Sequence, residues 1–163
     1  MTTYTVEKRL KDAVEASFQA LVTDETIASL SVSVRGAAID LGAMEDDTWN
    51  VVLCMTETAI QAGLGIYTNT ILVLADARKR YSVDIDLIAP ATVRQDADIA
   101  KQFLDRAARV YGGDETFCRL AQMVTFRSGA QLDSDQIYGD HIIVAREYEV
   151  TFDHDGSDPT LVR

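Results

Sequence analysis

Histidines and closely spaced acids are the residues of this sequence that could hold a metal ion. A metal site needs clustered ligands, and the two histidines, His141 and His154, have no second histidine at helical spacing. We interpret both as solvated side chains, His141 on a strand edge and His154 in a tail. The segment FDHDGSD looks like a calcium loop, but an EF-hand needs glycine at position 6, and here it comes at position 4 counted from Asp153. An EF-hand is excluded, and weak divalent-ion binding stays open.

Catalytic chemistry would need paired carboxylates, an activated nucleophile or a phosphate-binding loop. Asp84 and Asp86 could form an acid-base pair, but we interpret them as the polar outer face of a half-buried strand. Cys54 lies in a dense apolar strand where a thiol is inert, and we expect Cys54 and Cys118 to be reduced and buried. The segment AGLGIYTNT has two glycines but no third, and no Lys-Ser or Lys-Thr pair. The sequence therefore predicts no enzyme, no cofactor and no bound metal.

The net charge argues against one class of function. The chain has 26 acidic and 15 basic residues, which gives a formal net charge of −11. Proteins gain affinity for nucleic acids by neutralising phosphates with Lys and Arg. The only basic runs are KRLK near the N-terminus and RKR at 78–80. We expect no tight binding of DNA or RNA, because such an acidic surface repels phosphates.

The stretch from Trp49 to Ala89 organises the elements that must position these residues. In WNVVLCMTE, alternate apolar residues fall on one face of an extended strand. Between 69 and 88 the apolar residues again share one parity, which is typical of β structure. They are Ile71, Val73, Ala75, Ala77, Tyr81, Val83, Ile85 and Leu87. Because Val83 would then lie in the core, Val83→Asp should unfold the subunit.

Two arrangements of residues 69–88 stay open. One unbroken strand would span roughly 65 Å at about 3.3 Å per residue, whereas a compact chain of this length is about 40 Å across. A hairpin that turns through residues 76–80 would keep the same face apolar, although DARKR has no Gly, Pro or Asn for a tight turn. The sequence predicts either a long β-hairpin or a strand that protrudes toward a partner subunit.

The linker AIQAGLGIYT is too apolar for an ordinary surface loop. If it were solvated, it would expose an apolar patch of the kind that soluble monomers avoid. It either packs on the chain's own core or packs on another subunit. We take its large apolar residues and the basic run that follows as the candidate interface: Ile60, Leu64, Ile66, Tyr67, Arg78, Lys79 and Arg80.

The remaining sequence predicts one domain of the α+β class. Apolar residues recur at helical spacing over residues 5–22 and 95–111, and they alternate again over 142–152. We expect a mainly antiparallel sheet with two amphipathic helices packed on one face, over residues 1–152. Residues 153–163 should form an acidic, extended tail that is disordered or ordered by a neighbour. With no membrane span or signal peptide, we expect a cytosolic protein or one assembled from cytosolic subunits.

The order of these elements resembles a known family. A helix near the N-terminus, a β-hairpin region, a second helix of about four turns and a closing strand, VAREYEVTF, are similar to tail terminator and head-to-tail completion proteins of tailed bacteriophages. The resemblance covers about residues 3–152, and the long loop at 36–48 departs from smaller family members. It implies a structural virion protein of the phage neck, assembled in the host cytoplasm as a homo-oligomeric ring, usually a hexamer. Its partners would be the tail tube and head-completion proteins.

In such a ring, DNA would pass through the lumen without specific binding. Acidic residues that face the lumen would repel its phosphates, and the candidates are Glu45, Asp46, Asp47, Asp84 and Asp86. Two other classes stay open. One is a small cytosolic α+β domain that binds a protein or ligand as a dimer. The other is an enzyme whose site is assembled between subunits from Asp84, Asp86 or His141.

Overall fold

The computed structural model describes residues 4–23, 27–32, 44–113, 115–121, 123–126 and 135–162. Its elements, in chain order, are α1 (Val6–Thr23), β1 (Ile27–Val32), β2 (Trp49–Ala62), β3 (Ile66–Arg80), the 3₁₀ helix η2 (Ile85–Leu87), α2 (Pro90–Gly113), α3 (Glu115–Leu120), β4 (Met123–Phe126), β5 (Asp135–Tyr138) and β6 (His141–Asp155).

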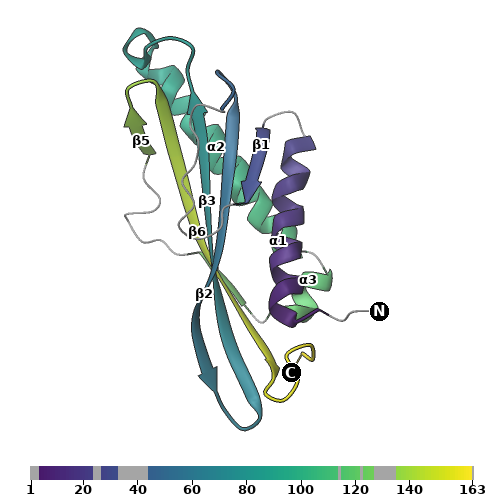
Figure 1. The fold of residues 1–163 in the computed structure, drawn as a ribbon. Coiled ribbons are helices and arrows are strands. Elements are labelled where there is room, and N and C mark those ends of the chain that lie inside the picture. The colour runs from purple at the N-terminus through teal and green to yellow at the C-terminus, as the bar shows by residue number, and fades with distance from the viewer. Residues whose placement is uncertain are drawn as a thin grey trace.

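The strands form one sheet in the order β1-β2-β3-β6-β4, and β5 also pairs with β6. β3 is paired along its whole length with β6, and β4 and β5 lie end to end along the other edge of β6. Only the β1–β2 pair is parallel among the described strands. The helices lie on one side of this sheet (Figure 1). The predicted α+β fold with a mainly antiparallel sheet is confirmed.

The core lies between the helices and one face of the sheet. α1 buries a stripe of residues at helical spacing, which includes Leu10, Val14 and Phe18. On β3 every second residue from Ile71 to Ala77 is buried, because successive side chains of a strand point to opposite faces. α2 is longer than predicted and begins at Pro90, whose fixed φ suits the first turn of a helix.

β2 and β3 form a long hairpin that turns at Gly63–Gly65, within the segment expected to be a linker. Gly65 has φ +73°, a conformation that glycine adopts without steric cost, and the Gly63 amide donates to the Ile66 carbonyl over 2.8 Å. The hairpin extends past the N-terminal end of α1 (Figure 1). Both arrangements considered for residues 69–88 are wrong, since β3 neither turns at 76–80 nor continues beyond Arg80.

The chain leaves the sheet after Arg80, where local polar contacts replace strand pairing. The Asp84 side chain accepts a hydrogen bond from the Asp86 amide over 2.9 Å and caps η2. Val83 and Leu87 are therefore 49% and 79% exposed, although they share the parity of the core residues. The expectation that Val83 lies in the core is wrong, and the reason given for Val83→Asp to unfold the subunit is lost with it.

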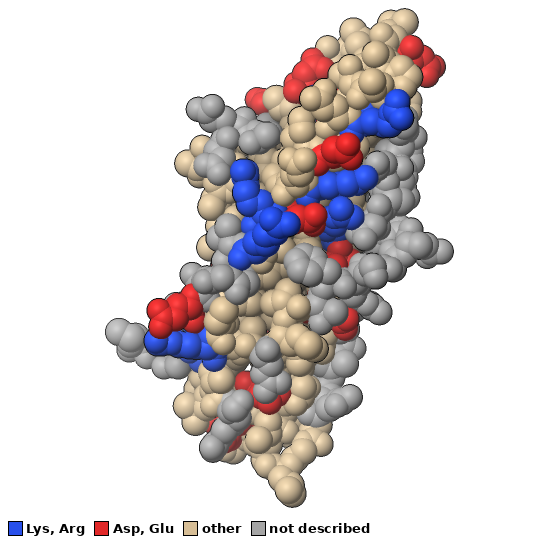
Figure 2. Space-filling model, turned by 180° about the vertical axis from the view of Figure 1, so that it is seen from behind, with Lys and Arg blue, Asp and Glu red and all other residues tan. Residues whose placement is uncertain are grey.

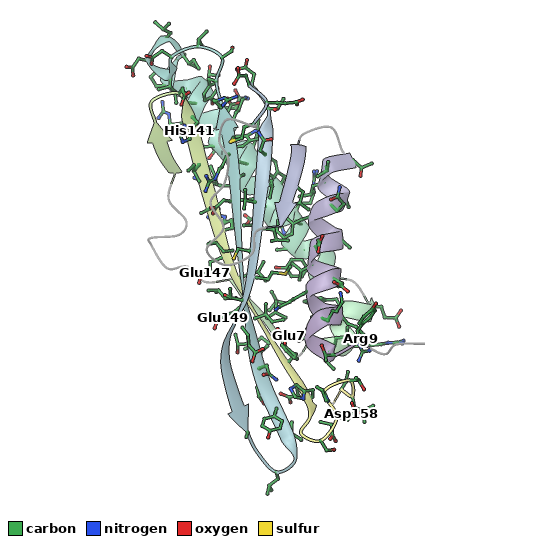
Figure 3. All side chains as sticks on the ribbon, viewed as in Figure 1. Glu7, Arg9, His141, Glu147, Glu149 and Asp158 are labelled. Carbon is green, nitrogen blue, oxygen red and sulfur yellow. The ribbon has the colours of Figure 1, made fainter. Side chains whose placement is uncertain are left out.

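The end of the chain is ordered by the chain itself, rather than forming an extended tail from residue 153. β6 continues to Asp155, and residues 156–162 fold back along it. The Pro159 carbonyl accepts from the Val6 amide over 3.0 Å, and the Thr160 carbonyl accepts from Arg9 over 2.5 Å. Figure 3 shows Glu7 and Arg9 at the N-terminal end of α1, near the segment that contains Asp158. These bonds fix the first turn of α1 against the end of β6.

The two cysteines differ in their surroundings. Cys54 is half-buried on β2, whereas Cys118 is exposed on α3. The expectation that Cys118 is buried is wrong, because the segment that carries it forms a short helix whose buried residues are Phe117 and Leu120.

Candidate functional site

The tip of the β2–β3 hairpin exposes large apolar side chains. Leu64 is fully exposed at the turn, and Ile66 is 39% exposed. Tyr67 is half-buried, and its ring centroid lies 5.5 Å from that of His154. The backbone of Ile60 pairs with Asn69, and the Ile60 side chain lies outside the described residues. Among the apolar interface candidates whose side chains are described, Leu64 and Ile66 are thus the exposed ones.

The basic candidates at 78–80 make contacts within the chain. Arg78 pairs with Asp76 at 3.2 Å. Lys79 pairs with Asp96 of α2 at 3.0 Å, beside the rings of Trp49 and Tyr81. Arg80 pairs with Asp46 at 2.5 Å. These three residues lie at the opposite end of β3 from Leu64, roughly 45 Å away at about 3.3 Å per residue. They cannot form one continuous patch with the hairpin tip.

The acidic candidates gather at the end of the sheet opposite the hairpin tip. The Asp47 amide donates to the Arg80 carbonyl over 2.6 Å, and the Asp47 carboxylate accepts from the Ser82 amide over 3.2 Å. Hydrogen bonds from the hydroxyl and amide of Ser82 lower the pKa of Asp47. Two segments far apart in sequence, 45–47 and 84–86, are therefore brought to one end. Their side chains are exposed at Glu45, Asp46, Asp47, Asp84 and Asp86.

The histidines lie in β6 rather than in solvated positions. His141 begins the strand, and its Nδ1 donates to the carboxylate of the preceding Asp140 over 2.9 Å, which lowers the pKa of Asp140. His154 lies near the end of the strand, and its Nδ1 donates to the Asp155 carbonyl over 2.8 Å. The two are separated by most of the length of β6. They cannot act in one site of the same subunit.

A pocket of about 300 Å³ opens where the hairpin extends beyond α1. Adjacent strands supply its sheet side, because Asn69 pairs with Phe152 and Tyr67 pairs with His154 across β3 and β6. The N-terminal end of α1 and the folded-back C-terminal segment supply the other walls. The lining residues are Thr5, Glu7, Glu57, Tyr67, Asn69, Phe152, His154 and Pro159.

The pocket holds a pair of carboxyl groups from different elements. Burial raises the pKa of Glu57, and the negative charge of Glu7 and a hydrogen bond between the two carboxyl groups raise it further. Lys11, whose Nζ lies 2.6 Å from Glu7, and His154 act in the opposite direction. Glu57 therefore retains its proton more readily than an isolated glutamate would.

Asn69 places an unsatisfied hydrogen-bond donor at the pocket. Its side chain is 3% exposed, and its Nδ2 is buried without a hydrogen-bond partner. Buried polar groups are normally hydrogen-bonded. Asn69 is therefore an exception to this rule among the residues that line the pocket.

From the sequence, Tyr67 was expected to lie in an interface and His154 to be solvated. The pocket that they line was not predicted. Glu57 and Asn69 do carry a signal. Each is a polar residue at a position where the alternation of β2 or β3 would place an apolar side chain on the covered face.

Charged residues of both signs alternate along α2, on the face of the molecule opposite to the one seen in Figure 1. Figure 2 shows basic and acidic side chains interleaved there, and Arg146 of β6 pairs with Asp105 of α2 at 3.3 Å. The charged residues of α2 are Arg94, Asp96, Asp98, Lys101, Asp105, Arg106 and Arg109. Mixed charge of this kind does not form a uniform basic surface for phosphates.

Within the described ranges, no group of three or more His, Cys, Asp or Glu side chains could hold a metal ion. No helix in those ranges is long and apolar enough to cross a membrane. No protein-family model matches the chain, and no curated protein does.

Proposed function

We propose that this chain is a structural subunit of a homo-oligomeric ring, of the tail terminator or neck type found in tailed bacteriophages. The observation that carries the proposal is the β2–β3 hairpin, which extends past α1 and ends in the exposed side chains of Leu64 and Ile66. Burying a large aliphatic side chain is worth about 1.5–3 kcal/mol. An exposed apolar tip on a projecting hairpin is therefore suited to insertion into a neighbouring subunit.

The position of the tip favours a ring over a simple dimer. When the end of an arm contacts a different surface of its neighbour, the contact is heterologous, and such contacts close into rings or continue as filaments. The tip lies at one end of a long sheet and the acidic segments lie at the other. Each subunit thus offers two chemically different ends, which suits head-to-tail assembly.

The acidic end fits the lumen of such a ring. Glu45, Asp47, Asp84 and Asp86 are exposed there, whereas the charge of Asp46 is offset by Arg80 at 2.5 Å. Carboxylates that line a channel repel phosphates, so DNA passes without being retained. In this proposal the tail tube and the head-completion proteins contact the two rims of the ring.

Charge placed at the hairpin tip tests the proposal. Leu64→Asp combined with Ile66→Asp should leave the fold intact and weaken assembly, because both side chains are exposed in the subunit but covered in the ring. Mass photometry of the full chain measures the assembly, and circular dichroism measures the fold.

The matched control is Val83→Asp combined with Leu87→Asp, which adds the same charge on exposed apolar residues at the opposite end. The control should assemble like the natural sequence. If the tip variant also assembles normally, the hairpin is not the interface. If the tip variant loses its circular dichroism signal, the tip belongs to the core of the subunit and the proposal fails.

The alternative is a small α+β domain that binds a ligand as a dimer, and the pocket beside Asn69 is the observation that favours it. The same mass measurement separates the two functions. A ring gives one species of several subunits, whereas the alternative gives a species of one or two subunits that the tip variant does not change.

A further inference from the structure

We infer that the surface that receives the β2–β3 hairpin is the opposite edge of the sheet in a second copy of this chain. This inference rests on the function proposed above, because it assigns the two surfaces that meet in the ring. One surface is the outer edge of β2 together with the hairpin tip. The other is the outer edge of β4 together with Leu161 and Val162 of the C-terminal segment.

The outer edge of β2 is open toward the hairpin tip. β1 pairs with β2 only as far as Leu53, and no described strand pairs with this edge over residues 54–62. An open edge presents backbone N–H and C=O groups that can pair with a further strand. The register shifts between Glu57 and Ala59, and such a bulge interrupts the ladder. The regular part of the open edge is therefore residues 55–57.

The outer edge of β4 is open at the same level of the sheet. β4 pairs with β6, and no described strand pairs with its other edge. Three rows of paired residues cross the sheet from β4 through β6 and β3 to β2. They are Val124–Val150–Ile71–Glu57, Thr125–Glu149–Leu72–Thr56 and Phe126–Tyr148–Val73–Met55. Both open edges thus lie in the same three rows.

The two edges also run in opposite directions. β2 is antiparallel to β3, β3 is antiparallel to β6, and β6 is antiparallel to β4, so β4 is antiparallel to β2. Subunits related by rotation about an axis along the strands keep these directions. The β4 edge of one copy then meets the β2 edge of the next as an antiparallel pair. This contact joins two different surfaces, so it can be repeated around a ring.

The C-terminal segment continues the edge that β4 forms, at the level of the hairpin tip. His154 pairs with Tyr67 on one side and bridges Val162 on the other. The Asp155 amide donates to the Leu161 carbonyl over 2.9 Å. Leu161 and Val162 are 50% and 42% exposed. When the β2 and β4 edges of two copies pair, the tip of one copy reaches these two residues of the other.

A second copy therefore satisfies both edges in one contact. The open backbone groups of β2 and β4 pair with each other, and the exposed side chains of Leu64 and Ile66 meet those of Leu161 and Val162. Covering apolar surface in this way favours association. An unrelated peptide bound at one edge would leave the other edge and its apolar residues in solvent.

A disulfide between copies tests the pairing of the edges. The variant carries Thr56→Cys and Thr125→Cys, together with Cys54→Ser and Cys118→Ser, which remove the natural thiols. Within one subunit, three strand spacings separate the two new cysteines. This amounts to roughly 14 Å at about 4.8 Å each, whereas a disulfide joins Cα atoms no more than about 7 Å apart. The two cysteines can therefore form a disulfide with each other only across two subunits.

After oxidation, this variant should give a ladder of covalent oligomers on a non-reducing gel. The matched control replaces Thr125→Cys by Gln136→Cys, which lies on the same edge of β6 but at its other end, and it should give no ladder. A slip of one residue would turn each side chain to the other face, so the ladder also reports the register. No ladder from the first variant, or an equal ladder from the control, would overturn the pairing.

An exchange of charge tests the contact between the tip and the C-terminal segment. Leu161→Lys combined with Val162→Lys should weaken assembly in mass photometry and leave the circular dichroism signal unchanged. Added to Leu64→Asp and Ile66→Asp, the same lysines should restore part of the lost assembly, because opposite charges then meet. If they restore none, the tip contacts another surface. If the lysines abolish the circular dichroism signal, the two residues support the subunit's own fold and the assignment is wrong.

The particle mass of the natural sequence separates this inference from the ring itself. A ring together with a ladder supports both. A ring whose variant with cysteines at 56 and 125 gives no ladder leaves the ring standing and overturns the pairing of the edges. A ladder from open chains of any length supports the pairing and contradicts a closed ring. A natural sequence that stays monomeric overturns both.

Discussion

Asn69 and Glu57 are polar residues on the covered face of the sheet, where their neighbours are apolar. Asn69 pairs with Phe152 of β6, and Glu57 pairs with Ile71 of β3. Phe152 and Ile71 are both buried. A buried donor left without a partner costs about 1–3 kcal/mol. Both residues depart from the apolar alternation that otherwise specifies the covered face of the two strands.

The raised pKa of Glu57 predicts how stability depends on pH. Above the ordinary pKa of about 4.5, the unfolded chain releases this proton while the folded chain retains it. The folded state then binds more protons, so the contribution of Glu57 to stability falls as pH rises from about 4.5 through the raised value. Glu57→Gln removes this loss, so the variant should be more stable than the natural sequence at pH 7.

Urea denaturation at pH 4 and pH 7 measures this effect. The gain from Glu57→Gln at pH 7 should shrink at pH 4, where the carboxyl group is protonated in both states. Glu45→Gln serves as the control for a change of charge on an exposed side chain. A variant that is less stable than the natural sequence at pH 7 would contradict the raised pKa.

At the scale of elements, the position at which β3 ends determines which apolar residues are buried in the core. Val73 is fully buried on β3, whereas Val83 has the same parity but lies beyond the end of the strand and is 49% exposed. Val73→Asp should destabilise the subunit by about 3–5 kcal/mol, because it buries an unpaired charge. Val83→Asp should change the free energy of unfolding by no more than about 0.5 kcal/mol. Urea denaturation of the two variants measures both values, and equal effects would contradict this end of the strand.

The long periodic elements could be predicted from the sequence. The stripe of α1 and the alternation of Ile142, Val144 and Tyr148 on β6 are set by the requirement to bury one face, and all of these residues are buried. The end of β3 could not be predicted from the apolar alternation, because the alternation continues past Arg80. The chain leaves the sheet there through a local polar contact, the cap that Asp84 provides for η2. The turn at Gly63–Gly65 did carry a signal, since a short segment with glycines between two alternating runs is typical of a hairpin.

The pocket could not be predicted, because it is formed by residues distant in the sequence. Glu7 and Glu57 meet only once α1 packs beside the hairpin, and Pro159 joins them only because the end of the chain folds back on α1. The alternation of β2 and β3 marks Glu57 and Asn69 as polar exceptions, but it does not show what lies opposite them. Only the tertiary arrangement provides that information.

The whole molecule is organised as an arm with two different ends. One end carries exposed apolar residues at the hairpin tip, and the other carries the acidic segments at 45–47 and 84–86. An asymmetric subunit of this kind can satisfy its apolar tip by contacting a different surface of the next copy. The acidic ends of successive copies would then be repeated around one opening.

Single-particle cryo-EM of the purified full chain tests the ring most directly. We predict a closed ring in which Leu64 and Ile66 of each subunit are covered by the next subunit, and in which Glu45, Asp47, Asp84 and Asp86 face the central channel. Particles without a closed ring, or a ring in which the hairpin tips remain in solvent, would contradict the account.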